Sequence, residues 1–252
     1  MTSLAFAMPD PTLDTSGITP PPSDLYSDEP TMETYVHLMQ MILLLESLQI
    51  SWKDRDDFFA AGNLTVYFSP RQLKSEHFRG PDFFVVLGTD RHPRKSWTVW
   101  EEDGRYPNLI VEILSESTEA IDRGLKKQIY QDVFRTPDYF WFDPETHELA
   151  GFHLVDGRYE PLSPDAGGRL WSAQLELYLA LHEGTLRFFT PGGALLPAAK
   201  ELAQQATELA QQTKELAQQT KELAQQVETA ERRSAHLAEK LRELGVDPDA
   251  VK

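Results

Sequence analysis

The residue with the clearest chemical potential is a glutamate inside an apolar segment. Glu112 is the only charged residue of the run from Leu109 to Leu114, and the other residues of this run are aliphatic. Such a run is typical of a strand that is buried on both faces. A buried carboxylate is usually protonated, paired with a cation or bound to a metal, because an unpaired buried charge is costly. The alternative is an edge strand on which Glu112 faces water.

A second carboxylate lies at the entrance to another apolar segment. Asp82 follows Pro81 and precedes the strand-like run from Phe83 to Leu87. Two carboxylates on neighbouring strands can hold a hard divalent ion such as Mg²⁺, which polarises a phosphate and lowers the pKa of a bound water. A nearby lysine would position that water or stabilise the charge that develops on the phosphate. A Pro-Asp pair is also common in turns, so Asp82 alone does not define a site.

The elements that must position these residues indicate an α/β fold. The helical spacing of apolar residues predicts an amphipathic helix over residues 31–53, which should cover one face of a sheet. A second helix is expected over residues 120–134, before Pro137. Strand composition predicts strands over residues 64–68, 82–87, 97–100, 109–114, 139–142 and 175–181. This order of helix, strands, helix and strands is typical of an α/β core with antiparallel additions.

The two ends of the chain differ in composition from this core. Residues 1–30 are rich in Pro, Ser, Thr and Asp and predict an irregular arm, followed by a domain over 31–192 and by a linker and helix over 193–252. The tail repeats Lys-Glu-Leu-Ala-Gln-Gln, with variation, every seven residues. Its leucines at 202, 209, 216, 223, 237 and 244 fit heptad position d, whereas position a carries Ala206, Thr213, Thr220, Val227, Ser234 and Leu241. Because Ala, Thr and Ser are poor a residues, a coiled coil and a solitary solvated helix both stay open.

Composition narrows the class of protein. The 252 residues carry a formal net charge of −16, which argues mildly against tight, non-specific DNA binding. The domain has few clusters of basic residues, among them Arg71, Lys74, His77 and Arg79, and Arg91, His92, Arg94 and Lys95. The absence of cysteine excludes disulfides, thiolate metal sites and cysteine nucleophiles. No apolar run reaches membrane-spanning length, so a soluble cytoplasmic protein without membrane contact is the default expectation.

Several motifs in a fixed order resemble a known family. They are Gly80-Pro81-Asp82, the segment from Tyr106 to Thr118, the spacing Asp122-x-x-x-Lys126-x-x-x-Tyr130, and the segment from Thr136 to Pro144. Together they resemble the Uma2 family, also called DUF820, which is abundant in cyanobacteria and belongs to the PD-(D/E)XK restriction-endonuclease-like superfamily. The resemblance implies a restriction-endonuclease-like core, with a mixed central sheet flanked by helices, added antiparallel strands and a long C-terminal helix.

The resemblance also implies roles for individual residues. Asp82 matches the Asp of the PD motif and Glu112 matches the acidic residue of (D/E)XK. Both would be catalytic and would bind the metal, together with the backbone carbonyl of Ile113. The implied cofactor is Mg²⁺ or Mn²⁺.

The motif's lysine would fall at position 114, which is Leu114 in this chain. Lys126 in the following helix matches the family's spacing and is the expected catalytic lysine, with Lys127 as a competitor. Lys126 could instead pair with Asp122, one helical turn earlier. Two weaker candidates are Glu46, which could add an acid to the site, and Asn63, for which a turn role is the simpler reading.

The implied function is a metal-dependent endonuclease that hydrolyses phosphodiester bonds in nucleic acid, with DNA as the expected substrate. Self-association, possibly through the C-terminal helix, would fit an enzyme that cuts both strands. The alternative is a catalytically inactive nuclease-like binding or scaffold protein that acts through a coiled-coil tail. None of the seven histidines has a neighbour at H-x-x-x-H spacing, so no zinc site is expected.

Overall fold

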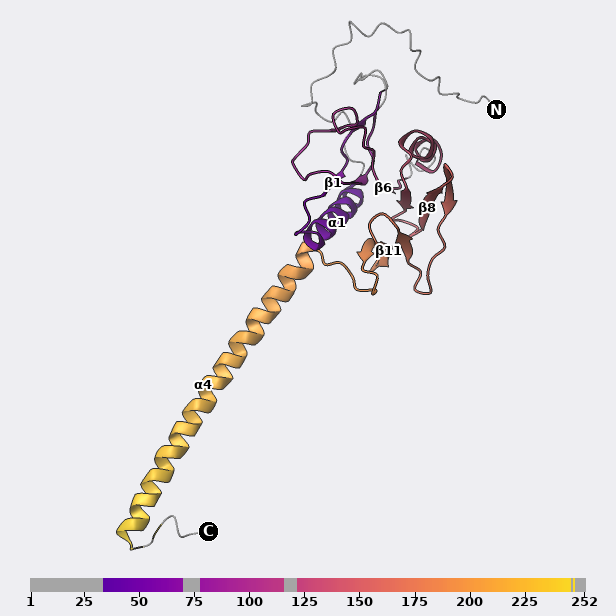
Figure 1. Ribbon diagram of the computed structural model, residues 1–252. Coiled ribbons are helices and arrows are strands. Elements are labelled where there is room, and N and C mark those ends of the chain that lie inside the picture. The colour runs from indigo at the N-terminus through magenta and orange to yellow at the C-terminus, as the bar shows by residue number, and fades with distance from the viewer. Residues whose placement is uncertain (1–33, 70–77, 116–121, 246, 248–252) are drawn as a thin grey trace, which may run out of the picture. The chain divides into compact units, whose positions relative to one another are not determined.

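A computed structural model describes residues 34–69, 78–115, 122–245 and 247 (Figure 1). The chain divides into two compact units between Ala198 and Ala199. The expected irregular arm over residues 1–30 and the basic residues Arg71, Lys74 and His77 lie outside the described residues.

In its described residues, the first unit combines one long helix, a short helical crossover and twelve strands. The helical elements are α1 (Tyr35–Ser51), η1 (Asp122–Lys126), α3 (Lys127–Ile129) and η2 (Tyr130–Phe134). The first seven strands are β1 (Phe58–Gly62), β2 (Val66–Tyr67), β3 (Phe78–Arg79), β4 (Phe83–Leu87), β5 (Trp97–Thr98), β6 (Leu109–Ile113) and β7 (Asp138–Phe142). The remaining strands are β8 (Leu149–Val155), β9 (Arg158–Pro161), β10 (Leu170–Ser172), β11 (Leu177–His182) and β12 (Thr185–Phe189).

The central sheet is mixed. It has six strands in the order β1-β4-β6-β7-β8-β9, and β6 and β7 form its parallel pair. Parallel neighbours need a crossover connection, and residues 122–134 supply it. Two three-stranded sheets, β10-β11-β12 and β3-β2-β5, complete the unit. Together with the long C-terminal helix, this arrangement confirms the expected fold class.

Each face of the central sheet is covered by an apolar core. On one face, Leu44 and Leu48 of α1 pack with Val111 and Phe140, together with residues of β10 to β12. The side chain of Gln40 holds α1 to this layer, because it both donates to and accepts from the backbone of Leu186 at 2.9 Å. The expectation that the first helix covers one face of a sheet is therefore confirmed.

The other face is rich in aromatic side chains. Ile110 and Tyr139 pack there with Tyr130 and Phe134 of the crossover. Side chains alternate along a strand, so Glu112 shares this face with Ile110. Because β6 lies between β4 and β7, the alternative that Glu112 occupies an edge strand is wrong.

Several local predictions need correction. The edge strand β1 was not predicted, because Phe-Phe-Ala-Ala-Gly is short and has no polar and apolar alternation. The strands expected over 64–68 and 97–100 shorten to β2 and β5. The crossover is not a regular α-helix, since π-helical η1 and η2 flank the short α3. Such wide turns are frequent at functional sites.

In the second unit the structure describes the helix α4 (Ala199–Glu243), which is 45 residues long and has no buried residue. The segment before it belongs to the first unit, because the amide of Leu196 donates to the carbonyl of Phe188 at 2.9 Å. Among the residues with a described placement, no helix is long and apolar enough to cross a membrane.

Candidate active site

Glu112 is fully buried, and the crossover supplies two of its hydrogen-bond partners. Its side chain has 0% exposure. The hydroxyl of Tyr130 donates to Oε1 at 2.6 Å, and the ammonium of Lys126 donates to Oε2 at 3.2 Å. Lys126 and Tyr130 are four residues apart, so one side of the crossover presents both donors to the carboxylate. The charge that stood out in the sequence is therefore compensated by an ion pair and a strong hydrogen bond.

Asp82 immediately precedes β4 and is also buried. Its Oδ2 atom accepts a hydrogen bond from the Ile113 amide at 2.7 Å, and its Oδ1 atom lies 3.1 Å from Nε2 of His37 on α1. Because Ile113 directly follows Glu112, the backbone bond holds the two acids in one site. Asn63 contributes through its main chain, since its amide donates to the Asp82 carbonyl at 3.0 Å and its φ of 48° is that of a turn residue.

The surroundings of these groups shift their pKa values. Burial acts to raise the pKa of Asp82, but the contact and charge of His37, the charge of Lys126 and the Ile113 amide outweigh it, so the pKa is lowered. Burial, with the negative charge of Glu112 beside it, raises the pKa of Tyr130 well above its usual value. Asp82 therefore keeps its negative charge at neutral pH, and Tyr130 remains a hydrogen-bond donor.

The two neighbouring lysines occupy different environments. Lys126 forms an ion pair with Glu112 and its side chain is 17% exposed. The ammonium of Lys127 lies 3.3 Å from the ring centroid of Phe152, and burial lowers its pKa. The contact of Lys126 with Glu112 reaches from the crossover to strand β6, and the side chain of Asp122, the alternative partner, lies outside the described residues. Of the two lysines, Lys126 is the one placed against the acids.

Two residues of the site were missed or given no role. His37 has no second histidine at a metal-ligand spacing, so the sequence gives it no role. The helix α1 brings it to Asp82 in space. Tyr130 was recognised as part of a motif, but its bond to Glu112 was not anticipated. Glu46, proposed as an added acid, lies farther along α1, and among the described residues no hydrogen bond or ion pair joins it to Asp82 or Glu112.

The donor set suits a hard divalent cation. Among the described residues, no three His, Cys, Asp or Glu side chains are grouped as metal ligands. A metal here would therefore depend on the carboxylates of Asp82 and Glu112, on backbone oxygen such as the carbonyl of Ile113, and on oxygens of water or substrate. Mg²⁺ is usually bound in this way, by one or two carboxylates with water and phosphate oxygens, so the residues present fit the ion.

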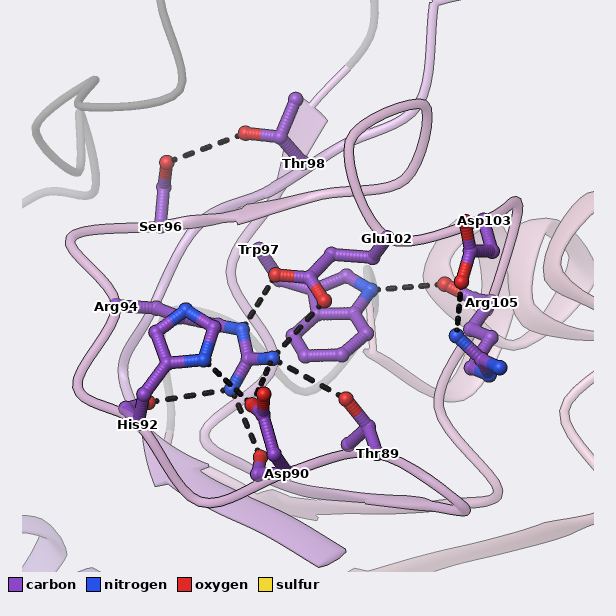
Figure 2. Close-up of polar contacts among 10 residues, drawn as sticks. All are labelled: Thr89, Asp90, His92, Arg94, Ser96, Trp97, Thr98, Glu102, Asp103 and Arg105. Atoms are coloured by element: carbon purple, nitrogen blue, oxygen red, sulfur yellow. Dashed lines mark hydrogen bonds and ion pairs between the residues drawn. The ribbon is translucent and has the colours of Figure 1, made fainter.

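The basic loop after β4 is occupied by internal contacts (Figure 2). The guanidinium of Arg94 pairs with Glu102 and donates to Asp90 at 3.0 Å and to Thr89 at 3.1 Å. It also lies over the Trp97 ring, 4.9 Å from the centroid. Its side chain is 5% exposed. Arg94 thus stabilises the loop, and its positive charge is neutralised inside the protein.

The family model described as "Uma2: Putative restriction endonuclease" matches residues 31–188. "Uncharacterized protein slr1290" of Synechocystis sp. is 32% identical over 110 residues, which is 43% of this chain and 55% of that relative. The chain thus spans about half the length of this curated relative. A crystal structure of "a putative nuclease belonging to DUF820" from Anabaena variabilis is 16% identical with a TM-score of 0.40, covering 55% of this chain and 73% of the other.

Proposed function

Because the chain belongs to the Uma2 family, we propose that it is a metal-dependent endonuclease that hydrolyses phosphodiester bonds in DNA. The observation that carries this proposal is the convergence of two buried acids and one lysine. Lys126 contacts Glu112 at 3.2 Å, and the amide next to Glu112 holds Asp82 at 2.7 Å. Phosphodiester hydrolysis uses this set of groups, with acids for the metal and a cation for the developing charge.

The two acids are held by different parts of the fold, and this prepares them for a metal. Tyr130 fixes one oxygen of Glu112, while His37 and the Ile113 amide fix Asp82. Mg²⁺ or Mn²⁺, held by both carboxylates and the Ile113 carbonyl, would polarise the scissile phosphate and lower the pKa of a bound water. The ordered contacts keep the carboxylates in place before an ion arrives.

Lys126 is proposed as the catalytic lysine in place of the one absent at position 114. Its side chain is partly exposed, whereas the side chain of Glu112 is buried. It can therefore turn toward a phosphate or an attacking water while its stem stays against the site. There it would hold the water in line or stabilise negative charge on the phosphate.

DNA is proposed as the substrate on the basis of the family. Binding need not rely on the loop after β4, because Arg94 is paired with acids there and Arg91 donates to the carbonyl of Arg55 at 2.9 Å. Substrate would instead be recruited largely through the metal, Lys126 and other cations. Affinity should therefore fall with added salt and depend on the divalent ion.

Plasmid cleavage tests the proposal. Wild type should nick or cut supercoiled plasmid with Mg²⁺ or Mn²⁺ and stop when EDTA is added, and Lys126→Met should be inactive. Lys127→Met is the matched control, since it removes the adjacent lysine that lies over Phe152. A single-stranded RNA of similar length, in parallel, decides between DNA and RNA. Absence of metal-dependent cleavage of either nucleic acid would sink the proposal and favour the scaffold alternative.

Self-association is a separate proposal that would suit this reaction. A duplex has two strands, so an enzyme that cuts both is served by two active sites. The exposed leucines of α4 offer a contact surface that does not involve the acids of the first unit.

A further inference from the structure

The helix α4 presents a continuous apolar stripe to solvent. Its leucines recur at intervals of seven residues, and Leu209, Leu216 and Leu223 are 61–65% exposed. Of the α4 residues whose burial is described, none is buried. Large apolar side chains arranged in one line along a helix mark a surface that another helix can cover.

The polar groups within this stripe are already satisfied by the helix itself. Thr213 and Thr220 lie at heptad position a, and their hydroxyls donate to the carbonyls of Leu209 and Leu216 at 2.8 Å. Such hydroxyls can be covered without losing their partner. The bonds between glutamine and glutamate side chains, such as Gln211 to Glu215 at 2.8 Å, join heptad positions f and c on the outward side and would survive a contact along the stripe.

The flanks of the stripe favour a second copy of this chain as the partner. Over the first four heptads, position e is always alanine, at 203, 210, 217 and 224, and position g is always glutamine, at 205, 212, 219 and 226. Two identical helices can therefore approach without placing like charges opposite each other. A second copy also carries the same seven-residue period. Two helices must share this period if their apolar stripes are to stay in contact over many turns.

We propose that α4 pairs with α4 of a second copy as an antiparallel two-stranded coiled coil. The sizes of the a and d residues determine the direction. In a parallel pair, the leucine layers at position d would alternate with position-a layers, four of which, at 206, 213, 220 and 234, pair two alanines, threonines or serines and would leave voids. In an antiparallel pair, each a residue meets a d residue of the partner, so small side chains face large ones.

One register brings the full length of the stripe into contact. It pairs Ala206 with Leu237, Thr213 with Ala230, Thr220 with Leu223, Val227 with Leu216, Ser234 with Leu209, and Leu241 with Leu202 of the second copy. Five of these six pairs contain a leucine, and only the pair of Thr213 and Ala230 joins two small residues. The same register places the cations Arg233 and Lys240 beside glutamines of the partner.

This inference concerns α4 and does not depend on nuclease activity, so its failure would leave the proposed reaction untouched. Cysteine cross-linking of the full-length protein tests it directly, because the natural sequence has no cysteine. The double variant Ala206→Cys/Leu237→Cys should form interchain disulfides on mild oxidation. Ala206→Cys alone should not, since the two residues 206 would lie about 46 Å apart at 1.5 Å per residue.

The outcomes separate the possibilities. Cross-linking of the double variant but not of Ala206→Cys, with a dimer in light scattering, is the expected result. Efficient cross-linking of Ala206→Cys alone would show a parallel pair and overturn the proposal, and so would a monomer at every concentration tested. Leu216→Glu should raise the concentration needed for dimerisation at least about tenfold, while the outward Lys214→Glu should not.

Discussion

Two neighbouring strands of the central sheet each carry a fully buried carboxylate, and the two are held in different ways. Glu112 on β6 lies on the face covered by the crossover, and Asp138 begins β7 on the face that carries Phe140. Both have 0% exposure. The donors around each acid, and not its depth of burial, distinguish a candidate reactive site from a structural one.

Asp138 of β7 has hydrogen-bonding partners in β8, in β10 and in the turn after β10. Its Oδ2 atom accepts from the hydroxyl of Ser172 at 2.6 Å and from the amide of Gln174 at 3.0 Å, and its Oδ1 atom lies 2.6 Å from Nδ1 of His153. These donors belong to strands or to the turn after a strand, and they are fixed by the fold. Asp138 therefore ties β7 and β8 to the sheet that contains β10.

The ion pair between Glu112 and Lys126 can be broken without unfolding the site. Lys126 is partly exposed and ends a flexible side chain, so a metal or a phosphate can replace its contact with the carboxylate. Tyr130 can keep its bond to the other oxygen meanwhile. The comparison predicts that changes at Glu112 act mainly on activity and that changes at Asp138 act mainly on stability.

The largest effect is expected for Glu112→Gln. The amide keeps the shape of the side chain and can still accept from Tyr130, but it loses the charge that would hold the metal. Metal-dependent plasmid cleavage should fall by on the order of 10²–10³-fold, measured as initial rates. Cleavage within twofold of wild type would remove Glu112 from the site.

Asp138→Asn should act on folding. The change removes the negative charge that accepts from Ser172 and the Gln174 amide and replaces one buried acceptor oxygen with an amide donor, so the free energy of unfolding should fall by about 3 kcal/mol. Urea unfolding followed by circular dichroism measures this. The folded variant should still cleave plasmid, and a selective loss of cleavage with unchanged stability would reverse the comparison.

Tyr130→Phe should lower the free energy of unfolding by less than Asp138→Asn does, and the size of this loss should depend on pH. Loss of the 2.6 Å bond to Glu112 should lower the free energy of unfolding by about 1–2 kcal/mol at pH 7. Because the pKa of Tyr130 is raised in the folded protein, its contribution is present below the unfolded pKa, about 10, and declines as the pH rises above that value. Unfolding curves of wild type and variant should therefore converge above pH 10, and a constant gap would argue against the raised pKa.

Lys127→Met should have the smallest effect. Its ammonium lies over Phe152 and does not contact the acids in the described structure, so the loss should be about 0.5–1 kcal/mol of stability at most. Cleavage rates should stay within about threefold of wild type, less than the tenfold that 1.4 kcal/mol represents. A loss of cleavage equal to that of Lys126→Met would mean that the two lysines act together.

The sequence was informative where a single residue conflicted with its neighbours. The aliphatic run around Glu112 predicts a strand, which is β6, and the apolar run after Asp82 predicts another, which is β4. The seven-residue repeat predicts a helix, which is α4. The family motifs contain both acids in a fixed order, so the resemblance alone predicts that Asp82 and Glu112 share one site. The roles of Asp82, Glu112, Ile113 and Lys126 in metal binding and catalysis stay predictions.

The sequence was uninformative where distant segments meet. His37 reaches Asp82 from a helix 45 residues earlier in numbering, and no local pattern marks that contact. The sequence marks the loop around Arg94 as a basic cluster, but the pairing of Arg94 with Glu102 depends on how the loop folds back. The π-helical turns of the crossover were also missed, because periodicity distinguishes helix from strand but not one helical pitch from another.

Calorimetric titration with Mn²⁺ tests the central claim most directly, because it measures metal binding without requiring a correct substrate. Wild type should bind the ion, and Glu112→Gln should lose most of that binding. Ser172→Ala, which disturbs the surroundings of the other buried carboxylate, should bind as wild type does. Equal binding by Glu112→Gln and wild type, or no binding by wild type, would contradict the account.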